Sequence, residues 1–239
     1  MNTNRQPSPV IAVFQRAWRA LVFRYAGKTV FTYETGRSRK FYDVIGRFYD
    51  WLYAEAIYDY EHAAEYMISR YIQPHDFVLD VGCGTGLLSL LSAAEADLVV
   101  GLDTSIGMIR RALKKSAGFP NIHYVVGDCR RLPLQQPFDN IITSFMMVIL
   151  NRQDQINTMV GFKSLLREGG EVVFLTARES AASQWLSRDD WQQISAEAGF
   201  DILDIEDILD GYRIVRLGLP VPVDQCQPTD AMAVSSLSG

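Results

Sequence analysis

A glycine-rich turn is the part of the sequence best suited to hold a ligand. The short β-branched run from Phe77 to Val81 leads into it, and Gly82, Gly84 and Gly86 follow at alternate positions. Glycines let a ligand approach the backbone, because a side chain would block that approach and because glycine adopts positive φ at little cost. Helix-terminal N–H groups after such a turn can hold an anionic or carboxylate group. The spacing lacks the extra residue of the dinucleotide G-x-G-x-x-G fingerprint, so a diphosphate cofactor fits less well.

Two further carboxylates stand where later apolar runs end. Asp103 closes the run that begins at Leu98, 23 positions after Asp80, near the offset of about 20 residues at which an acid meets ribose hydroxyls. One carboxylate can accept both vicinal hydroxyls, although a helix N-cap is an alternative role for Asp103. Asp128 ends the third run, and a plain loop acid is its alternative role.

These residues need a scaffold of alternating strands and helices. Short apolar runs regularly interleaved with helices predict a parallel sheet covered on both faces. After a mostly helical segment over 41–71, strands are expected at 77–81, 98–102, 123–126, 138–145, 171–176, 200–205 and 212–217, and helices at 87–95, 106–116, 154–166 and 187–198.

With Asp80 two positions before Gly82, the stretch from Val78 to Leu87 resembles the first motif of class I S-adenosylmethionine-dependent methyltransferases. The resemblance covers about residues 41 to 217 and extends to the segments that follow the second and third strands. It implies a Rossmann-like α/β fold, with a seven-stranded, mostly parallel sheet, helices on both faces and an N-terminal helical extension. The family places an antiparallel seventh strand at the edge of the sheet.

The resemblance also assigns roles. The glycines let the backbone meet the amino-acid end of S-adenosyl-L-methionine, and Asp80 supports its ammonium group. Asp128 accepts the adenine amino group, and Cys129 offers a backbone N–H to the ring. The implied cofactor-binding residues are Tyr49, Asp80, Gly82, Cys83, Gly84, Thr85, Gly86, Asp103, Thr104, Met108, Asp128, Cys129 and Ser144.

Three residues are candidates for the neighbourhood of the transferred methyl group. Ser144 and Phe145 follow the fourth strand, where methyl group and acceptor should meet. Tyr49 lies in a segment that looks like the helix preceding the core in quinone and phospholipid-headgroup methyltransferases, where a Tyr-Asp pair lies against the cofactor; core packing is its alternative role. No catalytic base is assigned, because the three histidines lie away from this turn in sequence.

The expected function is in-line methyl transfer to a small, amphiphilic or lipid-like molecule, as an enzyme of class EC 2.1.1. Positioning and a dry pocket supply much of the acceleration in such a displacement. The alternatives are a protein methyltransferase, a catalytically silent cofactor-binding scaffold and an NAD-dependent oxidoreductase. No metal site is expected, because CxxC, HExxH and Asp-rich calcium-loop patterns are absent from the sequence.

Charge and composition divide the chain. Residues 1–40 carry eight basic side chains and one acidic one, whereas the whole chain has a formal net charge of −5. The acidic remainder is a poor nucleic-acid binder. We expect a basic amphipathic N-terminal extension over 1–40 whose helix, 10–25, acts as a lid, contacts an anionic membrane peripherally or serves as a targeting segment. A methyltransferase domain over 41–218 and a disordered tail over 219–239 follow. The three cysteines show no spacing typical of disulfide pairs, which favours a cytoplasmic location.

Overall fold

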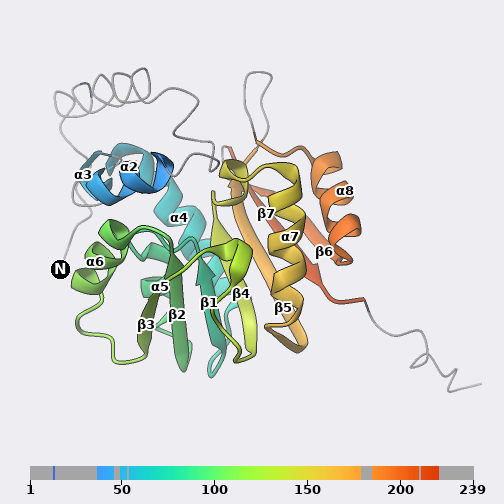
Figure 1. The fold of residues 1–239 in the computed structure, drawn as a ribbon, viewed down its shortest axis with the longest axis horizontal. Coiled ribbons are helices and arrows are strands. Elements are labelled where there is room, and N and C mark those ends of the chain that lie inside the picture. The colour runs from blue at the N-terminus through green and yellow to red at the C-terminus, as the bar shows by residue number, and fades with distance from the viewer. Residues whose placement is uncertain are drawn as a thin grey trace, which may run out of the picture.

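The structure is a computed structural model, and it describes residues 37–45, 49–52, 54–178, 185–209 and 211–220, together with Val13. Seven strands form one sheet in the order β3-β2-β1-β4-β5-β7-β6, with helices on both faces (Figure 1). The predicted Rossmann-like architecture is confirmed. The strands are β1 (Phe77–Val81), β2 (Leu98–Asp103), β3 (Ile122–Val126), β4 (Phe138–Ser144), β5 (Leu166–Ala177), β6 (Asp201–Ile208) and β7 (Tyr212–Gly218). The helices are α2 (Arg37–Ile45), α3 (Tyr49–Leu52), α4 (Ala54–Tyr71), α5 (Leu87–Ser92), α6 (Ile106–Lys115), α7 (Arg152–Lys163) and α8 (Arg188–Ala198).

Three central strands bring the predicted site residues together. β1 pairs in parallel with β2 on one side and with β4 on the other, so that Val78 lies opposite both Val99 and Asn140. Their apolar residues are buried on both faces, as expected for a parallel sheet between two helical layers. The carboxyl ends of β1, β2 and β4 therefore meet where the strand order reverses, which is where ligands bind in such sheets.

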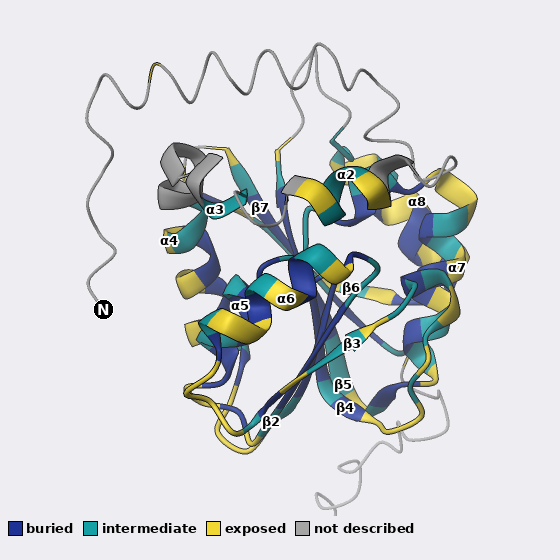
Figure 2. Ribbon diagram, turned by 60° about the vertical axis from the view of Figure 1, so that its left-hand side comes forward, coloured by how far each residue is buried: buried dark blue, intermediate teal, exposed yellow. Residues whose placement is uncertain are grey.

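The two faces of the sheet carry different helices. α4, α5 and α6 cover one face, and α7 and α8 cover the other (Figure 2). Alternate residues of β1 point into opposite layers: Val78 packs with the residues of α4 and α5, whereas Leu79 and Val81 pack with those of α7 and α8. Trp191 of α8 is fully buried, with its ring centroid 4.8 Å from that of Phe174.

The position of the seventh strand differs from the prediction. β7 is antiparallel as expected, but it pairs with both β5 and β6, so the edge strand is β6. β7 is buried along most of its length, while β6 carries Asp201, Asp204 and Glu206 and is largely exposed or half-buried. An apolar strand gains more from the interior of a sheet, and charges on an edge strand discourage pairing with other chains. The difference in burial therefore explains why β7 lies inside the sheet and β6 lies at its edge.

Two element boundaries also move. α5 ends at Ser92 rather than at residue 95, because the Asn121 side-chain amide donates to the Ala93 carbonyl oxygen at 2.9 Å and to that of Ala96 at 2.8 Å, which closes the chain after the helix. β5 begins at Leu166, within the predicted helix. Leu166 pairs with Phe138 of β4, and a shift in register separates this pair from the regular pairing that starts at Glu171.

Several predictions lie outside the described residues. These are the amphipathic helix over 10–25, of which only Val13 is described, and the tail beyond residue 220. The domain boundaries after residues 40 and 218 stay predictions. Among the helices in the described ranges, none combines the length and the apolar character needed to cross a bilayer.

Candidate active site

A cavity opens at the carboxyl ends of the central strands, beneath α2 and α3. Nine of the predicted residues line it: Tyr49, Gly82, Gly84, Asp103, Thr104, Met108, Cys129, Ser144 and Phe145. The other lining residues are Arg39, Tyr42, Leu102, Gly127, Met146, Ile149 and Leu150. Five predicted residues do not line it, namely Asp80, Cys83, Thr85, Gly86 and Asp128.

The glycine-rich turn forms the floor of the cavity. Gly82 has a φ of 73°, and its N–H donates to the Leu102 carbonyl oxygen at 2.7 Å, which ties the turn to β2. A Cβ on Gly82 would lie 2.9 Å from the Cγ atom of Met146, closer than real Cβ contacts. Glycine is therefore required here both by the backbone conformation and by the neighbouring side chain.

Asp103 is held in a fixed orientation at the end of β2. Its Oδ2 atom accepts from the Gly84 N–H at 2.9 Å, and its Oδ1 atom accepts from the Ser105 N–H at 2.8 Å. Burial raises the pKa of this carboxyl group, while the backbone hydrogen bonds oppose that rise. Each oxygen keeps lone-pair capacity after one bond. Asp103 thus faces the cavity as a preorganised acceptor for hydroxyl groups, and Ser105, rather than Asp103, is the N-cap of α6.

Asp80 lies beneath the turn instead of in the cavity. It is 1% exposed, and its Oδ2 atom accepts from the Ser89 hydroxyl of α5 at 2.6 Å. Burial raises the pKa of Asp80 to about 7, and the nearby Asp103 adds to the rise. Asp80 therefore does not line the cavity, and its support of an ammonium group stays a prediction. The remaining turn residues have structural contacts: Cys83 is buried, Gly86 precedes α5, and Thr85 bonds to α3.

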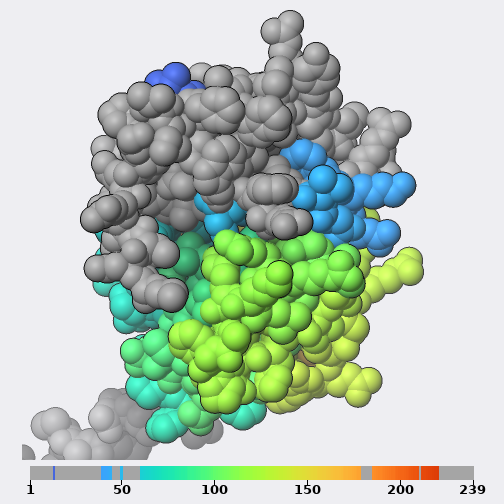
Figure 3. All heavy atoms as spheres, turned by 90° about the vertical axis from the view of Figure 1, so that its left-hand side faces the viewer, coloured from blue at the N-terminus to red at the C-terminus, as the bar shows by residue number. Residues whose placement is uncertain are grey.

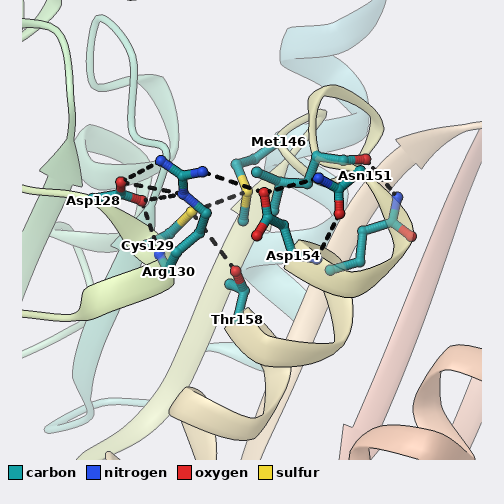
Figure 4. A network of polar contacts seen from close by, with 9 residues as sticks. Asp128, Cys129, Arg130, Met146, Asn151, Asp154 and Thr158 are labelled. Carbon is teal, nitrogen blue, oxygen red and sulfur yellow. Dashed lines mark hydrogen bonds and ion pairs between the residues drawn. The ribbon is translucent and has the colours of Figure 1, made fainter. Parts of the chain in front are cut away.

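Asp128 and Cys129 meet different partners (Figure 4). Asp128 is engaged by the Arg130 guanidinium, with a shortest distance of 2.7 Å, and Arg130 also reaches Asp154 at 3.2 Å. Burial alone would raise the pKa of Asp128, but the Arg130 hydrogen bonds and charge lower it. Cys129 is 6% exposed, with its Sγ 3.8 Å from the Met146 Sδ atom, and burial raises its pKa to about 12. A neutral packing thiol fits these surroundings better than a nucleophile does.

Two carboxylates attach α2 and α3 to the domain beneath them. These two helices form the roof of the cavity. Asp43 of α2 accepts from the Ser105 hydroxyl at 2.8 Å and from the Gly107 N–H at 3.2 Å. Asp50 of α3 accepts from the Thr85 hydroxyl at 2.6 Å and pairs with Arg111 of α6 at 3.0 Å. α2 consequently lies directly on α6 (Figure 3).

The roof contacts also set charge and orientation. Burial alone would raise the pKa of Asp50, but the charge of Lys115 and the hydrogen bonds from Thr85 and Arg111 hold it below its usual value. Because the aspartates bond to the domain, the tyrosines that precede them, Tyr42 and Tyr49, are the residues that line the cavity.

The end of β4 brings an unpredicted residue to the site. The Tyr60 hydroxyl of α4 lies 2.6 Å from the Ser144 Oγ atom. Nothing in local sequence signals this pair, which is separated by 84 positions. Tyr42, Arg39 and Gly127 were also missed, although Tyr42 precedes an aspartate just as Tyr49 does.

Other chemistry is not assembled around the cavity. His62, His75 and His123 are all exposed, and His75 bonds to Asp97 at 3.1 Å. Within the described ranges, no three His, Cys, Asp or Glu side chains are grouped closely enough to hold a metal ion.

Comparison with known proteins agrees with this geometry. The family described as a methyltransferase domain matches residues 78–170. The chain is 30% identical over 156 residues to tRNA U34 carboxymethyltransferase of Tolumonas auensis, covering 59% of this chain and 47% of the relative. It is 31% identical over 153 residues to malonyl-[acyl-carrier protein] O-methyltransferase of a Marinomonas species, covering 60% and 53%. The chain thus spans about half the length of these curated relatives.

Among solved structures, the complex of DhpI with SAH superposes with a TM-score of 0.67 at 17% identity, covering 76% of this chain and 94% of DhpI. At that identity the likeness concerns the fold, and it agrees with the seven-stranded topology described above. The similarity to methyltransferases beyond the fold comes from the sequence match over residues 78–170 and from the motif residues at the strand ends. On these grounds residues 78–170 match a methyltransferase domain, and the chain has the fold seen in class I S-adenosylmethionine-dependent methyltransferases.

Proposed function

We propose that this chain transfers the methyl group of S-adenosylmethionine to a small molecule. The observation that carries the proposal is Asp103, whose two oxygens are fixed by the N–H groups of Gly84 and Ser105 while the side chain lines the cavity. A carboxylate in this position is suited to two vicinal hydroxyls, as in a ribose. The cofactor fits the residues present, because polar acceptor, glycine floor and apolar walls occur in one cavity.

Each part of the cofactor has a complementary wall. The amino-acid end would lie on Gly82 and Gly84, where no Cβ intervenes. The adenine would lie between apolar or small side chains on the other side of Asp103, including Met108, Cys129 and Leu150. Asp80 lies below the turn, where it accepts a hydrogen bond from Ser89, so we propose that it acts on the ammonium group through the turn.

The cofactor supplies an electrophilic methyl group on a sulfonium. The residues of the chain position the reactants and keep the site dry: Met146 and Phe145 flank the end of β4, and Tyr49 covers the cavity from α3. Positioning of this kind can contribute much of the barrier reduction for a direct displacement.

We infer that the acceptor is small and amphiphilic. The cavity walls are largely apolar and aromatic, and the two short helices α2 and α3 lie over the cavity. The names of the relatives, one referring to tRNA U34 and the other to malonyl-[acyl-carrier protein], indicate no common acceptor. Peripheral membrane contact through residues 10–25 and a cytoplasmic location remain proposals from the sequence.

The test is transfer of label from methyl-labelled S-adenosylmethionine into a fractionated extract of the source cell. Label in a small-molecule fraction, lost in Asp103→Ala, supports the proposal. Label confined to protein would favour a protein methyltransferase. Cofactor binding without label in any fraction would favour a silent scaffold.

A further inference from the structure

The Tyr60 and Ser144 hydroxyls form a polarised pair at the cavity. Their oxygens are 2.6 Å apart, so one hydroxyl donates to the other. A phenol is the stronger donor, and burial raises the pKa of Tyr60, which keeps its proton in place. With Tyr60 donating to the Ser144 Oγ atom, the Ser144 proton is free to point into the cavity that this residue lines. Donation in series strengthens each hydrogen bond.

The neighbouring Phe145 builds an apolar wall beside this donor. Its φ of 54° is unusual for a residue with a side chain. Its N–H bonds to the Leu175 carbonyl oxygen at 3.1 Å, and its ring makes edge contacts with Tyr60, Trp185 and Tyr212 at centroid distances of 5.2, 5.5 and 6.2 Å. Strained backbone of this kind is concentrated at functional sites. Here it turns Phe145 into the cavity beside the Ser144 hydroxyl.

The described cavity lining contains one basic side chain that can face an anionic acceptor. This is Arg39 of α2, and within the described ranges no acidic side chain pairs with Arg39. Asp103 is the acidic residue among the described lining residues, and the proposed function commits it to the ribose. An ammonium acceptor would be repelled by the charge of Arg39. A carboxylate could accept hydrogen bonds from both the Arg39 guanidinium and the Ser144 hydroxyl.

We propose that the methyl acceptor is a carboxylate on an apolar body, and that Ser144, positioned and polarised by Tyr60, binds one of its oxygens. This inference rests on the proposed function and names its substrate class. The second carboxylate oxygen uses a lone pair to bond the methyl carbon. The carbon–sulfur bond breaks, and its electrons stay on sulfur. The products are a methyl ester and S-adenosylhomocysteine, and no proton needs to be removed.

The test uses two matched probes, 4-butylbenzoate and 4-butylbenzylamine, which share ring and chain but present a carboxylate or an ammonium. Each is titrated by calorimetry into the full chain saturated with S-adenosylhomocysteine. We expect the benzoate to bind the wild-type protein more tightly than the amine. Ser144→Ala should weaken benzoate binding about tenfold or more, since a hydrogen bond to a charged group is lost. Tyr60→Phe should weaken it severalfold, because the serine hydroxyl remains.

Controls separate this role from a structural one. Tyr66→Phe and Ser164→Ala remove the same groups away from the cavity and should leave both affinities unchanged. Ser144→Thr keeps a hydroxyl and should preserve the benzoate preference. S-adenosylhomocysteine affinity should stay within about twofold in Tyr66→Phe and Ser164→Ala, and in Ser144→Ala and Tyr60→Phe it should fall less than benzoate affinity does.

Three results would overturn the inference: no benzoate binding, amine binding as tight as benzoate binding, or variants that weaken S-adenosylhomocysteine binding but not benzoate binding. The last would assign the Ser144 hydroxyl to the carboxylate of the cofactor. A wild-type protein that gives no heat with S-adenosylhomocysteine would instead refute the proposed function, and the inference with it.

Discussion

Gly107→Ala should undock the roof of the cavity while leaving the sheet intact. Gly107 is the second residue of α6, and a Cβ there would overlap the Asp43 carbonyl oxygen and lie 2.7 Å from the Asp43 Cα atom. Both are backbone atoms, so the contact can be relieved only if α2 moves as a whole. That movement breaks the bonds from Asp43 to the Gly107 N–H and to the Ser105 hydroxyl.

Two opposing effects decide the outcome. Alanine favours a helix over glycine by at most about 1 kcal/mol. Hydrogen bonds to a charged group contribute about 1.5–3 kcal/mol each when buried, and these two are only partly buried, so about 2–4 kcal/mol for the pair is a reasonable bound. The net effect is a loss of roughly 1–3 kcal/mol from docking of α2. If the cofactor binds only beneath a docked roof, its apparent affinity falls by about tenfold.

The assay combines calorimetry with S-adenosylhomocysteine and limited trypsin digestion. Arg39 and Lys40 are exposed on α2, so undocking should accelerate cleavage after them, as identified by mass spectrometry. Gly118→Ala is the matched control, because no atom lies within 4 Å of a Cβ at that position. Unchanged affinity together with unchanged cleavage in a folded Gly107→Ala variant would refute the docking argument.

Asp103→Ala should lower S-adenosylhomocysteine affinity about ten- to hundredfold, from the loss of a charged acceptor worth roughly 1.5–3 kcal/mol; unchanged affinity by calorimetry in a folded variant would remove Asp103 from the site. Burial raises the folded-state pKa of Asp80 from near 3.8 to about 7. Its contribution to the free energy of unfolding should therefore be fully present below pH 4, and it should be lost as the pH rises through 7. Urea unfolding of wild type and Asp80→Asn should therefore differ in pH slope between pH 4 and 7, and parallel slopes would contradict the shift. Full-length protein should co-sediment with anionic vesicles in a salt-sensitive way that a version starting at Arg39 does not; equal recovery of both in the supernatant would end the membrane hypothesis.

The sequence was sufficient for the sheet and the glycine turn because both depend on local patterns. The run from Phe77 to Val81 is apolar and β-branched, and its strand has the predicted bounds. The motif residues also place Asp80 and Asp103 near one edge of the sheet. Their surroundings differ because each occupies a different position in its strand. Asp80 is the residue before the last of β1 and bonds to α5, whereas Asp103 is the last residue of β2 and lines the cavity. Only the packed structure distinguishes these orientations.

Long-range contacts account for most of what the sequence did not reveal. Asp43 and Asp50 bond to α6 or to the turns before α5 and α6, and no local sequence pattern signals these contacts. Tyr60 meets Ser144 only because α4 packs across the end of β4. The order of β6 and β7 depends on the relative burial of two neighbouring strands, which a local pattern does not compare.

Calorimetry of the wild-type chain with S-adenosylhomocysteine and, separately, with NAD tests the central claim most directly. The site contains an acceptor at the end of β2, Asp103, and a glycine turn without the dinucleotide spacing. We expect saturable heat from S-adenosylhomocysteine and none from NAD. Saturable binding of NAD, with no heat from S-adenosylhomocysteine, would contradict it.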